Sequence, residues 1–122
     1  MKQELRDFVQ KVLHRFGYTV LTAGDGEEAL HVSGAHAGPI HLLLTDVVMP
    51  HMNGRDLADA IVRTRPNLRV VYMSGHSDEV VSSRGLLERP PHLIQKPFSA
   101  ESLAREIRRA LDAPLPGAGR DA

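Results

Sequence analysis

The chain has 122 residues, and its 15 lysine and arginine residues balance 15 aspartate and glutamate residues. This length suits one domain with its own hydrophobic core, and the zero net charge gives no sign of nucleic acid or an anionic membrane as a partner. The sequence contains no cysteine, which excludes disulfides, thiolate zinc sites and a cysteine nucleophile. No apolar stretch approaches the length of a membrane span, and the first residues are too polar for a signal peptide. We therefore expect a cytoplasmic protein.

Short apolar runs alternate with segments of helical periodicity along the chain. In chain order the pattern predicts a helix over 5–16, a strand over 18–23, a helix over 27–32, a strand over 40–45, a helix over 57–62, a strand over 70–73, a helix over 79–87, a strand over 92–95 and a helix over 103–111. Gly17 and Pro66 mark the ends of the first and third helices. Strands that alternate with helices imply right-handed crossovers, so we expect an α/β domain over 1–112 with a parallel sheet and helices on both faces. Residues 113–122 lack periodicity and are predicted to form a flexible tail.

Three polar residues close three of the predicted strands, and each is followed by a turn. They are Asp46, Ser74 and Lys96. In an open parallel sheet the carboxyl ends of the strands share one edge, where such folds place their sites. Taken alone, the three residues are a capping aspartate, a turn serine and a solvated lysine. Together, a carboxylate, a hydroxyl and an ammonium at one edge suit a phosphoryl group carried on the aspartate.

Three motifs surround these residues: Thr-Asp-Val-Val-Met-Pro at 45–50, Met-Ser-Gly at 73–75 and Gln-Lys-Pro-Phe at 95–98. In this order the motifs resemble the receiver domains of bacterial two-component response regulators, especially receivers attached to hybrid sensor histidine kinases. The resemblance covers the chain from the first helix to about residue 111. It implies a flavodoxin-like fold and a signalling role as a phosphoacceptor, without enzymatic turnover.

The resemblance also assigns roles to residues. It implies that Asp46 accepts a phosphoryl group from a phosphohistidine of a sensor kinase or phosphotransfer protein, while Ser74 and Lys96 contact the phosphoryl oxygens. It implies Mg²⁺ as the cofactor, held in part by Asp46 and the backbone carbonyl of Val48. The peptide bond between Lys96 and Pro97 is often cis in the family.

The start of the chain departs from the family pattern. A first strand that ends in an acidic pair precedes the first helix in the family, whereas here the first helix begins at the first residues. N-terminal truncation is the simplest explanation. The missing strand leaves a gap between 18–23 and 40–45, which a strand-sharing homodimer would fill. Because Asp46 alone is a poor Mg²⁺ site, we expect slow or absent phosphotransfer to the chain as written.

The residues leave one main alternative function and disfavour two others. A domain that has lost its metal site and docks partners independently of phosphorylation is the main alternative. A hydrolase with an aspartyl nucleophile would need a second acid two residues later, where this chain has Val48. The glycine-rich segment 24–29 formally matches a dinucleotide fingerprint, but its three acidic residues would repel a pyrophosphate at the helix N-terminus.

Overall fold

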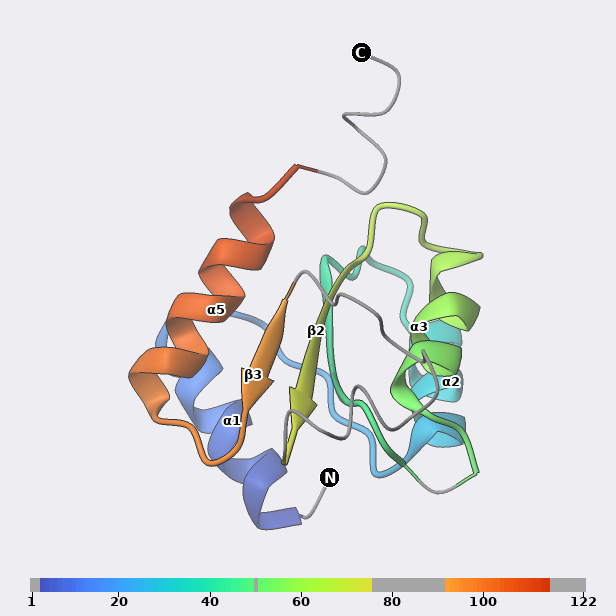
Figure 1. Ribbon diagram of the computed structural model, residues 1–122. Helices are drawn as coiled ribbons and strands as arrows, with labels where there is room; N and C mark the ends of the chain where they lie inside the picture. The colour runs from blue at the N-terminus through green and yellow to red at the C-terminus, as the bar shows by residue number, and fades with distance from the viewer. Residues whose placement is uncertain (1–2, 50, 76–91, 115–122) are drawn as a thin grey trace.

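The computed structural model describes residues 3–49, 51–75 and 92–114 (Figure 1). Its elements are α1 (Gln3–Arg15), α2 (Gly26–Ala35), β1 (Leu42–Asp46), α3 (Gly54–Val62), β2 (Arg69–Ser74), β3 (Leu93–Gln95) and α5 (Ala100–Asp112). The predicted helix over 79–87 and most of the predicted tail, residues 115–122, lie outside the described residues. The other predicted helices, and the predicted strands from residue 40 on, correspond to these elements with shifts of a few residues at their ends.

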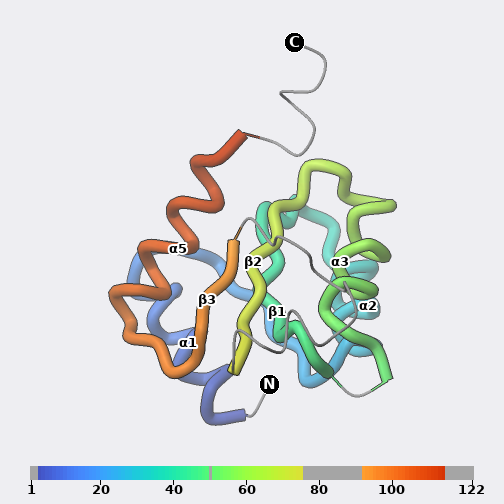
Figure 2. The backbone as a smooth tube through the Cα atoms, in the orientation of Figure 1, coloured from blue at the N-terminus to red at the C-terminus, as the bar shows by residue number. Residues whose placement is uncertain are grey.

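The sheet has three described strands in the order β1-β2-β3, and both pairs are parallel (Figure 2). Asp46 at the end of β1 lies opposite Met73, and Ser74 at the end of β2 lies opposite Gln95. The carboxyl ends of all three strands therefore meet at one edge, as the alternating sequence pattern predicts.

Helices cover both faces of the sheet (Figure 1). On one face, α1 and α5 pack against β2 and β3 through a buried cluster that consists of Val9, Val12, Leu13, Val71, Met73, Ile94, Leu103, Ile107 and Ala110. On the other face, Leu57 and Ile61 of α3 pack with Leu68, and side chains of α2 close this second cluster. The two clusters make the described fold a three-layer, flavodoxin-like α/β sandwich.

Capping side chains fix where the helices begin. Asn53 accepts a hydrogen bond from the backbone N–H of Asp56 at 2.8 Å at the start of α3. Ser99 and Ser102 form a reciprocal capping box at the start of α5. These bonds satisfy N–H groups that the first helical turn leaves without a partner. They place the start of α3 and of α5 in the loops beside the carboxyl edge of the sheet.

The prediction of a strand over 18–23 is wrong. This segment follows α1 but forms no strand in the structure, and the described sheet ends at β1. A β-rich run forms a strand only when a neighbour takes up its backbone hydrogen bonds, because β propensity depends on that context. Between this segment and β1 lies a cavity of about 820 Å³, lined by residues of both.

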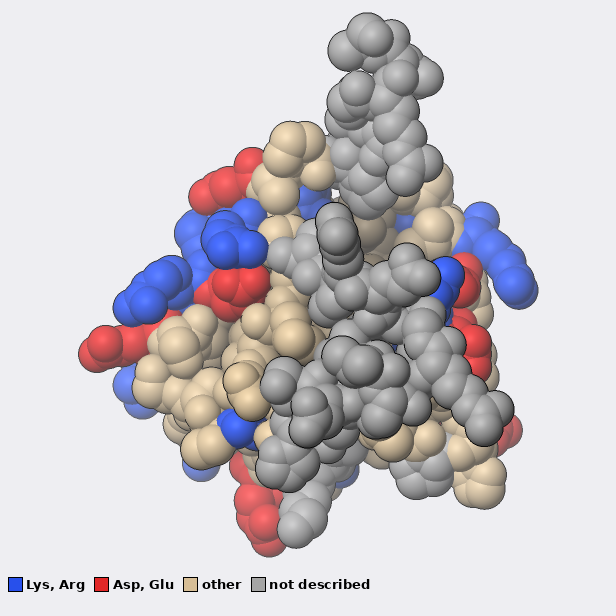
Figure 3. Space-filling view, viewed as in Figure 1, with Lys and Arg blue, Asp and Glu red and all other residues tan. Residues whose placement is uncertain are grey.

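The visible charges are mixed in sign. On the part of the surface that Figure 3 shows free of grey atoms, acidic and basic side chains lie next to one another. Opposite charges also pair along α5, where Arg108 lies 2.8 Å from Asp112 and Arg109 lies 3.8 Å from Glu106. None of the helices in the described ranges combines the length and apolar character needed to cross a membrane.

Candidate functional site

The structure brings the ends of the three predicted site strands together. Asp46 is the last residue of β1, Ser74 is the last residue of β2, and Lys96 follows β3 directly. The backbone holds these ends in register, because Lys96 N–H donates to the Ser74 carbonyl at 2.8 Å. In the same way, Val47 N–H donates to the Met73 carbonyl at 3.0 Å.

Asp46 and Lys96 form a close ion pair at this edge. The Lys96 Nζ atom lies 2.6 Å from the Asp46 Oδ1 atom. The Asp46 side chain is 9% exposed and the Lys96 side chain 33% exposed, so the carboxylate is sheltered while the ammonium still reaches solvent. This ion pair holds an ammonium where negative charge would accumulate on a group bound to the aspartate.

Ser74 lies beneath the same edge and is 1% exposed. Its position at the end of the central strand places it between the strand that ends in Asp46 and the strand that leads to Lys96. The bond between Lys96 and Pro97 is cis, an isomer that the sequence permitted but could not establish.

Two further residues position Asp46, and the sequence analysis missed both. Thr45 Oγ1 donates to the Asp46 carbonyl at 3.1 Å. Gly54, the first residue of α3, packs so closely on the Asp46 carbonyl that a Cβ atom built on it would overlap the carbonyl oxygen. Its N–H also donates to the Val47 carbonyl at 2.9 Å. The sequence feature that could have indicated the close packing of Gly54 is a glycine at the first position of a helix, directly after the capping residue Asn53.

The described residues do not fit Mg²⁺. They contain no cluster of three or more histidine, aspartate or glutamate residues that could hold a metal. Asp46 Oδ1 already contacts Lys96, and Val48 was expected to add one backbone carbonyl rather than a side-chain ligand. Magnesium usually requires one or two carboxylates within an octahedral set of oxygen ligands. One carboxylate already engaged by an ammonium is a weak basis for such a set.

One tyrosine on β2 has a shifted acidity. Burial raises the pKa of the Tyr72 hydroxyl above its ordinary value of 10.0, since the charged phenolate loses solvation. Asp59 on α3 raises this pKa further by repulsion, and Arg55 opposes the shift.

Taken together, the elements define a parallel α/β domain with a sheltered aspartate, a lysine and a buried serine at the carboxyl edge of its sheet. Comparison with known proteins agrees, since the family described as "Response regulator receiver domain" matches residues 2–108. The chain belongs to this family, whose members are the receiver domains of two-component systems.

The match covers very different shares of the individual relatives. The chain is 31% identical over 110 residues to the response regulator receiver protein CpdR of Brucella abortus, and the match covers 90% of each chain. It is 29% identical over 102 residues to the sensor kinase CckA of the same organism, and the match covers 84% of this chain but 11% of the kinase. Among solved structures, the receiver domain of NtrX from Brucella abortus is similar with a TM-score of 0.75 and 29% identity, covering 91% of this chain and 92% of that domain.

Proposed function

We propose that this receiver domain accepts a phosphoryl group on Asp46 from a phosphohistidine of a sensor histidine kinase or a phosphotransfer protein. The observation that carries the proposal is the sheltered Asp46 carboxylate, 2.6 Å from the Lys96 ammonium at the carboxyl edge of the sheet. Family membership and the similarity to both a stand-alone receiver and a sensor kinase support a role in phosphorelay. We also propose that the protein acts in the cytoplasm, as the sequence favours.

In the proposed transfer, a carboxylate oxygen of Asp46 forms a bond to phosphorus while the bond from phosphorus to the histidine nitrogen breaks. The electron pair of the broken bond stays on the imidazole, which takes up a proton from solvent. The Lys96 ammonium balances charge on the phosphoryl oxygens, and Ser74 offers a hydroxyl donor at the end of the neighbouring strand. The carboxyl group and the phosphoryl group then form an acyl phosphate, and loops after β2 and β3 carry the change to partners.

A second function has its own support. The described residues contain no cluster of three or more histidine, aspartate or glutamate residues that could hold Mg²⁺, so they supply no site for the divalent cation that the family resemblance implies. A domain of this kind would dock partners through its surface without being phosphorylated.

Intact-protein mass spectrometry distinguishes the two functions. The chain is incubated with acetyl phosphate, or with a histidine-phosphorylated phosphotransfer protein, in buffers with and without Mg²⁺. We expect a mass gain of one phosphoryl group that Asp46→Asn abolishes. Asp56→Asn is the matched control, because Asp56 is an exposed carboxylate in the first turn of α3, and this variant should keep the gain. If neither donor modifies a chain that circular dichroism shows to be folded, the docking function replaces the phosphoacceptor function.

A further inference from the structure

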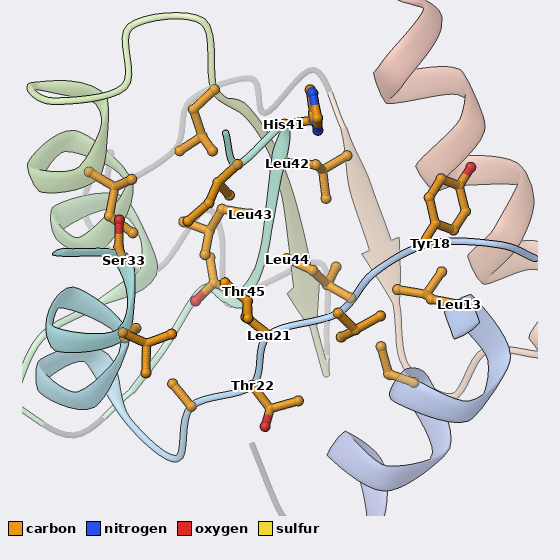
Figure 4. A pocket seen from close by; sticks show the side chains of 18 of the residues that line it. Leu13, Tyr18, Leu21, Thr22, Ser33, His41, Leu42, Leu43, Leu44 and Thr45 are labelled. Atoms are coloured by element: carbon orange, nitrogen blue, oxygen red, sulfur yellow. The ribbon is translucent and has the colours of Figure 1, made fainter. Parts of the chain in front are cut away.

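Thr45 directly precedes the proposed phosphoacceptor, and its side chain is taken out of water. The residue is 4% exposed. In the close view of Figure 4, Leu43 and Thr45 lie on one side of β1, whereas Leu42 and Leu44 lie on the other. Leu43 packs with the cluster under α3, so Thr45 lies on the face of the sheet that α3 covers. A hydroxyl buried on this face needs an acceptor within the protein.

Two acceptors lie near the Thr45 hydroxyl. The Asp46 carbonyl oxygen is 3.1 Å from Thr45 Oγ1, and the Met49 Sδ atom is 3.7 Å from it. A threonine hydroxyl has one hydrogen to donate, and a thioether sulfur is a weak acceptor. The hydrogen therefore goes to the Asp46 carbonyl, while Met49 packs beside the hydroxyl.

The peptide group that receives this bond is also held at its other end. Its N–H belongs to Val47 and donates to the Met73 carbonyl at 3.0 Å. Because a peptide group is planar, one bond to its oxygen and one to its N–H together fix its orientation. That orientation determines where the Asp46 backbone lies, and with it the carboxylate that contacts Lys96 at 2.6 Å.

The start of α3 limits how the Thr45 side chain can rotate. Thr45 Cγ2 lies 3.2 Å from the point that a Cβ atom would occupy on Gly54, so the methyl group faces the first residue of α3. Threonine is branched at Cβ, and its two γ atoms leave few conformations. With the methyl group against α3, the hydroxyl is aimed at the Asp46 carbonyl.

We propose that Thr45 is a positioning residue for phosphotransfer, whose hydroxyl holds the peptide after Asp46 so that the carboxylate stays beside Lys96. This inference rests on the proposed function, because it concerns how fast Asp46 accepts a phosphoryl group. The hydroxyl acts through the backbone and contacts neither the donor nor the phosphoryl group. Its loss should therefore lower the rate of transfer and leave the affinity for the donor unchanged.

Two substitutions of Thr45 separate the hydroxyl from the shape of the side chain. Thr45→Val keeps the branched shape without the hydroxyl, and Thr45→Ser keeps the hydroxyl. Intact-protein mass spectrometry follows phosphorylation at a series of concentrations of a histidine-phosphorylated phosphotransfer protein. We expect Thr45→Val to lower the maximal rate about tenfold or more, with the donor concentration for half-maximal rate unchanged. Thr45→Ser should stay within about threefold of the parent chain.

Two further variants are matched controls. Thr64 Oγ1 donates to the Ile61 carbonyl at 3.1 Å beyond the end of α3, so Thr64→Val removes a bond of the same kind and length and should keep the maximal rate. Met49→Leu removes the sulfur and fills nearly the same space, and it should also keep the rate. A loss in Met49→Leu equal to that in Thr45→Val would overturn the proposal, because the hydroxyl would then act through Met49.

Amide hydrogen exchange tests the geometry without phosphorylation. The Val47 amide belongs to the held peptide, whereas the Tyr72 amide donates to the His92 carbonyl at 3.0 Å elsewhere in the sheet. In Thr45→Val the Val47 amide should exchange about tenfold faster, or faster still, relative to the Tyr72 amide, and Thr45→Ser should keep the parent ratio. A general loss of stability would speed both amides together and leave this ratio unchanged.

The two readouts distinguish the proposal from the function on which it rests. An unchanged exchange ratio in Thr45→Val, or an unchanged maximal rate, would overturn the role of Thr45 and leave Asp46 as the phosphoacceptor. If the folded parent chain takes up no phosphoryl group, the proposed function fails. The exchange ratio then still decides whether the Thr45 hydroxyl holds the peptide after Asp46.

Discussion

Gly54→Ala should damage both the stability of the domain and the position of Asp46. The added Cβ would overlap the Asp46 carbonyl oxygen and lie 3.1 Å from its carbonyl carbon and 3.2 Å from Thr45 Cγ2. Favourable contacts between carbon atoms lie at ~3.5–4.0 Å, so the end of β1 or the start of α3 must move. Overpacking of this kind costs ~1–3 kcal/mol. We expect a loss near the upper end, because the movement also strains the bond from Gly54 N–H to the Val47 carbonyl.

Gly34→Ala is the matched control for this prediction. Gly34 lies within α2, and a Cβ built on it meets no atom within 4 Å. There the same substitution should raise the free energy of unfolding by about 0.5–1 kcal/mol, because alanine favours the helix over glycine. Urea denaturation followed by circular dichroism measures both changes from the midpoints at constant slope. If Gly54→Ala unfolds at the midpoint of the parent chain or above it, the close packing of Gly54 on Asp46 is wrong.

Two more predictions concern residues away from the site. The Arg65 guanidinium donates to the Ser33 side chain and to carbonyl oxygens at and after the end of α2. Because a lysine has no planar guanidinium to make these bonds together, Arg65→Lys should lower the free energy of unfolding by about 1.5–3 kcal/mol. An unchanged thermal midpoint would contradict this role of Arg65. The second prediction is that stability falls as the pH rises above about 10 and through the higher pKa of folded Tyr72, because the unfolded chain releases the phenolic proton first. In Tyr72→Phe, the urea midpoint should fall less between pH 10 and the higher pKa of folded Tyr72 than it does in the parent chain. An equal fall in both proteins would refute the contribution of Tyr72.

Much of the fold was readable from local patterns. Apolar runs at 40–45, 70–73 and 92–95 predicted the strands, because strands buried on both faces carry continuous apolar residues. The segment 18–23 shows the limit of such patterns, since its β-rich composition could form a strand only beside a partner that the described sheet does not supply.

The site was predictable at the level of residues and less so at the level of contacts. The ends of parallel strands converge by topology, so Asp46, Ser74 and Lys96 could be placed at one edge from their order alone. The 2.6 Å contact between Asp46 and Lys96 depends on side-chain conformations that no sequence pattern encodes. The close approach of Gly54 to the Asp46 carbonyl is likewise a property of how α3 docks on the sheet.

The most direct test of the central claim locates the phosphoryl group on the chain. After incubation with a phosphodonor, borohydride reduces an acyl phosphate of aspartate to homoserine, and peptide mass mapping identifies the residue that has changed. We predict homoserine at position 46, and none at that position in samples without donor. Homoserine at another aspartate, or none in a folded chain exposed to a histidine-phosphorylated donor, would contradict the assignment of Asp46 as the phosphoacceptor.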